Sequence, residues 1–89
     1  MFKMMVQFQV KDFEAWRKVY DSLGEVRKSR GVESDEILRD VSNPNKIVLY
    51  TKWKSLEEAK KWGASPDLRA AQEKGGVVGA PEIHYLTVM

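Results

Sequence analysis

The stretch MMVQFQVKDFEAWRKVYDSLGEV, residues 4–26, decides the fold, because its hydrophobic period changes from two to about 3.6 within it. Up to Val10, large apolar side chains occupy every second position, which predicts a strand with one strongly apolar face. After Asp12, a good helix N-cap, apolar residues recur at three- and four-residue steps and predict a helix over 12–30. The chain therefore begins with a strand that leads directly into an amphipathic helix.

The rest of the chain predicts a hairpin, a second helix and a final strand. The second helix has the capping box Ser55 to Glu58, is interrupted at Gly63, and restarts at Ser65 with a proline in its first turn. The expected segments, in chain order, are strands at 4–10, 33–41, 46–54 and 82–88, helices at 12–30 and 55–75, and a linker at 77–81.

This β-α-β-β-α-β order is the ferredoxin-like, or split-βαβ, α+β arrangement, formed here by one domain over residues 1–89. Two helices cover only one face of a four-stranded antiparallel sheet. Both faces of the 46–53 strand carry large apolar groups, Ile47, Leu49 and Trp53 on one and Val48 and Tyr50 on the other. An uncovered apolar face needs a second layer, so the sequence predicts a homodimer packed sheet to sheet.

Composition excludes several classes of chemistry. The chain of 89 residues has no cysteine and one histidine, which excludes disulfides, thiolate metal sites, iron–sulfur clusters and two-histidine metal motifs. A net charge of +2 is too small for a nucleic-acid footprint, and no apolar run is long enough to cross a bilayer. Without cysteine or a signal peptide, the expected location is the cytoplasm.

Several motifs together resemble the dimeric α/β-barrel superfamily and, within it, small proteins with an antibiotic-biosynthesis-monooxygenase-like domain. The motifs are VKDFEAWR at 10–17, PNKIVLYTKW at 44–53, SLEEA at 55–59, SPDLR at 65–69 and GVVGAP at 76–81. The resemblance spans essentially the whole chain. It implies the ferredoxin-like fold and sheet-to-sheet pairing as a dimeric α/β barrel.

The resemblance implies two alternative functions. One is a cofactor-independent monooxygenase or cyclase-like enzyme that acts on a small aromatic or polyketide-like compound. The other is a non-catalytic ligand-binding or stress-responsive dimer. Heme-degrading relatives use a histidine of the second helix as iron ligand, and residues 55–75 contain none, which disfavours heme. No nucleotide-binding loop is present either, so no cofactor and no metal are expected.

His84 is the candidate proton carrier, because it is the only side chain whose ordinary pKa lies near neutrality. The alternative is a structural or interface histidine that shares a sheet face with Leu86 and Val88. Gln7 and Gln9 are polar groups on a central strand and need hydrogen-bond partners if buried. They either bond across the dimer interface or line a polar pocket and orient a ligand.

Trp53, Trp62 and Tyr85 are the aromatic pocket candidates. Each offers a flat apolar surface with one hydrogen-bond donor, and the alternative for each is an ordinary place in the core. Trp53 is the strongest of the three, because it ends an inner strand beside the second helix. Arg17 and Arg27 on the first helix, and Lys60 and Lys61 on the second, are expected to face solvent. The alternative is that one of them attracts an anionic ligand.

Overall fold

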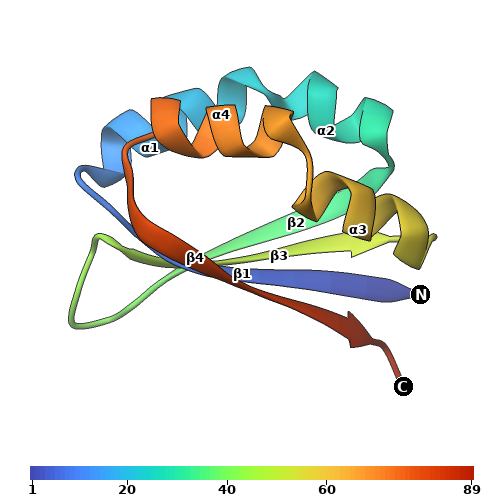
Figure 1. Ribbon diagram of the computed structural model, residues 1–89. Helices are drawn as coiled ribbons and strands as arrows, with labels where there is room; N and C mark the ends of the chain where they lie inside the picture. The colour runs from blue at the N-terminus through green and yellow to red at the C-terminus, as the bar shows by residue number, and fades with distance from the viewer.

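The computed structural model describes residues 1–89 and contains one four-stranded antiparallel sheet with all helices on one face (Figure 1). The elements are, in chain order, β1 (Phe2–Val10), α1 (Phe13–Ser22), α2 (Gly24–Arg30), β2 (Val32–Arg39), β3 (Lys46–Trp53), α3 (Leu56–Gly63), α4 (Pro66–Lys74) and β4 (Val77–Thr87). The strand order β2-β3-β1-β4 places β1 and β3 at the centre. The predicted ferredoxin-like fold is confirmed.

Strand register determines which side chains share a face. Met4, Val6 and Phe8 of β1 lie opposite Thr51, Leu49 and Ile47 of β3, and these pairs face the helices. Ile83 and Tyr85 of β4 lie opposite Val6 and Met4 and so share this side. We call this the helix face. The alternation seen in the sequence therefore assigns each strand residue to a face correctly.

The core fills the space between the helix face and the helices. The strands contribute Met4, Ile47 and Trp53, each at most 1% exposed. Helix α1 contributes Trp16 and Tyr20, whose spacing of four residues places them on one helix stripe. The core lies entirely on one side of the sheet.

The expected helix over 12–30 is wrong in one respect, because it is two helices that meet at Leu23. Ser22 Oγ donates a hydrogen bond to the carbonyl of Val19, which competes with the regular backbone pattern. Gly24 follows and has the lowest helix propensity of any residue except proline. Beyond the break, Val26, one of the apolar residues of the expected helix, is exposed, and Arg27 is buried.

The expected linker over 77–81 is also wrong, because these residues form the first part of β4. Val77 and Val78 lie opposite Val10 and Gln9, and the register shifts between Gln9 and Gln7. Gly79 adopts a φ of 74° at this irregularity, a conformation that glycine adopts without steric cost. Gly79 and Pro81, which suggested a linker, instead belong to an irregular edge strand.

The second sheet face carries no helix (Figure 1). We call it the open face. It mixes apolar and polar groups, with Met5, Val48 and Tyr50 beside Gln7 and His84.

None of the helices is both long and apolar enough to span a membrane.

Candidate functional site

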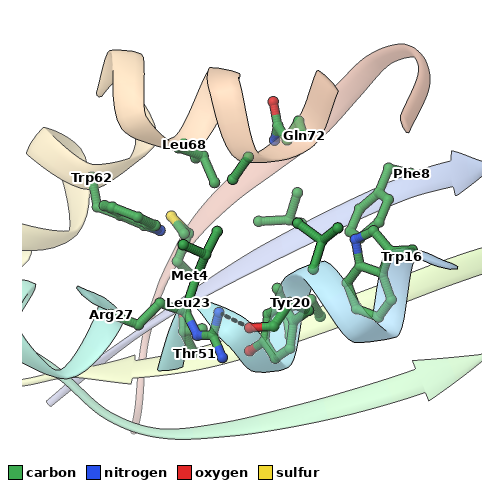
Figure 2. Close-up of a pocket in the computed structure, with 14 residues that line it drawn as sticks. Met4, Phe8, Trp16, Tyr20, Leu23, Arg27, Thr51, Trp62, Leu68 and Gln72 are labelled. Carbon is green, nitrogen blue, oxygen red and sulfur yellow. Dashed lines mark hydrogen bonds between the residues drawn. The ribbon is translucent and has the colours of Figure 1, made fainter. Parts of the chain in front are cut away.

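A cavity of about 50 Å³ lies between the helix face of the sheet and the four helices α1, α2, α3 and α4 (Figure 2). Eleven of its fourteen lining residues are hydrophobic. The lining comprises Met4, Val6, Phe8, Trp16, Val19, Tyr20, Leu23, Arg27, Leu49, Thr51, Trp62, Leu68, Ala71 and Gln72. An apolar cavity with a few polar groups is the usual form of a small-molecule site.

Helix and strand periodicity bring these residues together. Because the strand period is two, Met4, Val6 and Phe8 all point toward the helices. The helical spacing of Trp16 and Tyr20 places both on the side of α1 that faces the sheet. Tyr20 stacks on Trp16, with ring centroids 5.0 Å apart and an interplanar angle of 26°. The floor therefore combines aliphatic side chains with the Phe8 ring, and the α1 wall is aromatic.

Arg27 is the only charged group of the lining and is 8% exposed. Its Nη1 donates a hydrogen bond of 2.6 Å to the backbone carbonyl of Tyr20, and its guanidinium carbon lies 3.5 Å from the centroid of the Tyr20 ring. It forms no salt bridge. The cavity thus has one buried cation without a carboxylate partner.

Tyr20 joins this cation to the edge strand β2. Its hydroxyl donates a hydrogen bond of 2.5 Å to Asp35 Oδ2. Burial raises the pKa of the Tyr20 phenol far above its ordinary value, and the hydrogen bond to Asp35 raises that pKa further, while Arg27 and Arg17 oppose both effects. Tyr20 therefore remains a neutral donor and does not act as a base near neutral pH.

Thr51 and Gln72 are the other polar side chains of the lining. The Thr51 hydroxyl accepts a 2.9 Å hydrogen bond from Trp53 Nε1, so its own proton is free to donate. Neither a carboxylate nor an imidazole lines the cavity. The site can bind and orient a ligand and stabilise a negative charge, but it holds no general base.

The cavity is small for a ligand. A buried cavity of about 150 Å³ holds benzene, so a ring must displace part of the wall to fit here. The lining residues Leu68, Ala71 and Gln72 come from α4, in which no residue is buried. Because α4 is the most weakly buried wall, it is the element whose outward movement enlarges the cavity at the lowest cost.

Of the six predicted site residues, only Trp62 lines the cavity. Trp53 is fully buried in the core outside the lining. Tyr85 lies on the helix face, and its hydroxyl occupies the place where a Cβ at position 63 would lie. Whether any of these residues contacts a ligand stays a prediction.

The other three predicted residues lie on the open face, away from the cavity. Gln7 lies between Val48 and Glu82 on the neighbouring strands. Gln9 is exposed, and His84 Nε2 lies 2.9 Å from Glu82 Oε1. No group of three His, Cys, Asp or Glu side chains is arranged to hold a metal ion.

The prediction that Arg27 faces solvent is wrong, because Arg27 is buried. A signal was present, because Arg27 continues the stripe of Trp16, Tyr20 and Leu23 at steps of four, three and four residues. A charged residue at an inward position of such a stripe indicates a function or a buried partner. Asp35 carried no comparable signal, because it lies in a strand with several other charged residues.

Comparison with known proteins adds a family match. The family model described as antibiotic biosynthesis monooxygenase matches residues 1–74. No curated protein matches the chain in sequence.

Solved structures with the same fold share little sequence with the chain. A Bordetella bronchiseptica protein whose name places it among antibiotic biosynthesis monooxygenases has a TM-score of 0.80 at 12% identity, covering 99% of this chain and 96% of its own. SnoaB from Streptomyces nogalater, described as a cofactor-independent oxygenase, has a TM-score of 0.78 at 14% identity, with 99% and 92% covered. A Caulobacter crescentus protein named like the first has a TM-score of 0.77 at 19% identity, with 99% and 89% covered. At these identities the likeness shows the fold alone.

Proposed function

Because the chain belongs to the antibiotic biosynthesis monooxygenase family, we propose that it oxidises a small planar aromatic compound with O2, without a metal, heme or nucleotide. The observation that carries this proposal is the apolar cavity with its aromatic wall of Trp16 and Tyr20. Flat apolar walls favour a flat apolar ligand. The fold shared with SnoaB supports the same activity class.

The lack of a base in the cavity limits the chemistry. The substrate must ionise readily by itself, as an activated phenol or an enolisable ring ketone does, and it releases its proton to solvent. The carbanion then reacts with O2, a ring CH2 becomes a carbonyl, and the second oxygen atom leaves as water together with the two hydrogens. The protein contributes desolvation, orientation and stabilisation of the anion.

Oxygen consumption with a panel of dihydroxyaromatic and anthrone-like compounds tests this proposal. A matched pair of variants on α4 ties any activity to the cavity. Ala71→Leu places a larger side chain into the lining, whereas Ala70→Leu makes the same change at an exposed neighbour. We expect uptake that Ala71→Leu abolishes and Ala70→Leu leaves intact. No uptake with any compound, or equal uptake in both variants, would count against an oxygenase.

A non-catalytic ligand-binding protein is the second candidate, and the missing base favours it specifically. In this case the same compounds bind in the cavity and are recovered unchanged. Isothermal titration under air, followed by chromatography of the ligand, separates the two functions. Binding that Ala71→Leu blocks, with no oxidised product, identifies a binding protein.

We further propose that the functional unit is a homodimer packed through the open face. Val48 and Tyr50 lie there in the middle of the sheet, and Leu38 and Leu86, each 42% exposed, flank them. In this assembly Gln7 and His84 lie at the interface. Analytical ultracentrifugation at micromolar concentration is expected to give twice the chain mass of 10.2 kDa. A species of one chain mass would refute the dimer.

The proposed location is the cytoplasm, based on the absence of cysteine from the chain. Cell fractionation with an antibody against the chain tests it. Recovery in a membrane or secreted fraction would refute it.

A further inference from the structure

Arg27 is unusual because it is a buried cation that lines an apolar cavity and forms no ion pair. Its planar group offers five N–H donors, and one protein hydrogen bond, to the carbonyl of Tyr20, is formed. That carbonyl also accepts from the Leu23 amide, so it does not need Arg27. A buried, unpaired charge is expensive, and structural packing alone does not require a charge at this position.

Asp35 is a carboxylate near this cation, yet it does not pair with it. Asp35 and Arg27 line the same outer cavity of about 150 Å³ beside the β2 edge. The carboxylate instead accepts the short hydrogen bond from the Tyr20 hydroxyl. The ring of Tyr20 meanwhile supports the guanidinium from a distance of 3.5 Å. The Tyr20 side chain thus contacts both the cation and the nearby anion, and these two groups form no ion pair with each other.

We propose that Arg27 binds an anionic oxygen of the ligand and that Tyr20 is a positioning residue that keeps Arg27 available by holding Asp35. This inference rests on the proposed function in that the ligand occupies the cavity. The ligand is then a flat ring with a single negative oxygen at the α2 end, as a phenolate, enolate or carboxylate. Its remaining surface is apolar, because the lining opposite Arg27 is aliphatic and aromatic.

The cost of burying Arg27 is already met in the folded protein, so an arriving anion gains a strong interaction without reorganising the site. A charge-assisted hydrogen bond of this kind corresponds to about a 10- to 100-fold gain in affinity over a neutral ligand of the same shape. Glu33 shares the outer cavity but lies 3.6 Å from Lys54 Nζ, which partly balances its charge.

The test compares two probes of similar shape, 4-nitrophenol and nitrobenzene, with benzoate as a carboxylate. Ionised 4-nitrophenol absorbs in the visible range, so its bound fraction reports ionisation directly. At a pH where free 4-nitrophenol is half ionised, we expect the bound probe to be mostly ionised and to bind more tightly than nitrobenzene. The benzoate arm shows whether the site prefers a carboxylate or a phenolate oxygen.

Arg27→Met removes the charge and keeps a side chain of similar length. We expect it to lower the affinity for ionised 4-nitrophenol by about 10- to 100-fold and to leave that for nitrobenzene within about threefold. The matched control is Arg17→Met, which removes an exposed arginine of α1 and changes neither affinity. The expected change in melting temperature for Arg27→Met is below about 5 °C, since the charge has no partner to lose.

Tyr20→Phe and Asp35→Asn separate positioning from simple packing. Tyr20→Phe frees Asp35 to pair with Arg27, so the affinity for the anion falls while that for nitrobenzene persists. Asp35→Asn keeps an acceptor for Tyr20 and removes the competing charge, so the anion still binds. The double variant recovers the anion affinity that Tyr20→Phe lost, an outcome that a merely structural Tyr20 would not produce.

The outcomes distinguish this inference from the proposed function. If wild type binds nitrobenzene and ionised 4-nitrophenol equally, and Arg27→Met changes neither affinity, the role of Arg27 is refuted and the ligand cavity stands. If no probe binds, the cavity is not a ligand site, and both proposals are refuted. If the double variant fails to recover affinity, the positioning role of Tyr20 is refuted.

Discussion

The two faces of the sheet differ in how completely their side chains are buried. The helix face is almost purely apolar and is closed by four short helices, with Ile47 and Trp53 fully buried. The open face alternates with it along the same strands but mixes apolar groups with glutamines, lysines and a histidine. On the two central strands, the alternate residues from Met4 to Val10 and from Ile47 to Trp53 are buried, whereas those on the open face are half-buried or exposed. The difference indicates that stability and the ligand cavity belong to one face and assembly belongs to the other.

Ile47 and Val48 are neighbours on β3 that point to opposite faces, and their truncation tests this division most strongly. Ile47→Ala is expected to lower the free energy of unfolding by about 2–5 kcal/mol, because it leaves a cavity in a fully packed core. Val48→Ala is expected to lower it by much less, since Val48 is only half-buried in the chain. Urea unfolding at one protein concentration measures both. Equal losses would contradict the division.

Val48→Asp tests the assembly role of the open face. A charge at the centre of a sheet-to-sheet interface costs several kilocalories per mole unless it finds a partner. We expect sedimentation to give a single chain mass and far-ultraviolet circular dichroism to remain that of the folded chain. Glu57→Lys, an exposed charge change on α3, is the control that leaves the mass unchanged. A Val48→Asp protein that remains dimeric would place the interface elsewhere.

Gly63→Ala examines how tightly α3 approaches the helix face. A Cβ at this position would lie 2.0 Å from the Tyr85 hydroxyl oxygen, so the Tyr85 side chain has to move. Because Tyr85 is 37% exposed and able to shift, we expect a loss of about 1–2 kcal/mol in the free energy of unfolding. The loss should shrink in a Tyr85→Phe background. A loss that persists there in full would mean that the close approach involves other atoms.

Alkaline pH tests the burial of the Tyr20 phenol on the helix face, with Tyr50→Phe on the open face as a control that leaves Tyr20 in place. The pKa of Tyr20 is raised in the folded state, so its contribution to stability is fully present below about pH 10 and is lost as pH rises toward the folded value. Above about pH 10 the free energy of unfolding should fall more steeply in wild type than in Tyr20→Phe, by up to about 1.4 kcal/mol per pH unit. Tyr50→Phe should keep the steep decline. Identical slopes in wild type and Tyr20→Phe would contradict the burial of this phenol.

The fold could be predicted from the sequence because the hydrophobic period of a strand shows which of its residues point to the same face of the sheet. Met4 to Val10 and Ile47 to Trp53 alternate clearly, and their buried sets are those expected. The break at Leu23 was not predicted, because it depends on the competition of Ser22 and Gly24 with a continuous apolar stripe. The burial of Arg27 was missed for a different reason, because an arginine was expected to face solvent even on this apolar stripe.

The candidate site was harder to predict than the fold. Residue types that can carry chemistry, such as histidine and glutamine, are candidates wherever they lie in the chain, and the sequence alone does not show which of them border a cavity. Gln7, Gln9 and His84 are polar residues on central or neighbouring strands, yet they lie on the face opposite the cavity. The cavity itself is formed mostly by ordinary apolar residues from six elements, and its volume depends on side-chain packing. Only Trp62 belongs to both the predicted set and the lining.

The three tryptophan indole groups provide the most direct test of the claim that the ligand binds under the helix face. Trp16 and Trp62 line the cavity, whereas the Trp53 indole is bonded to Thr51 within the core. In a ¹H–¹⁵N correlation spectrum titrated with 4-nitrophenol, the account predicts large shifts of the Trp16 and Trp62 indole signals and of the Gln72 amide. Shifts confined to Gln7, Gln9 and His84 would place the ligand on the open face and contradict the account.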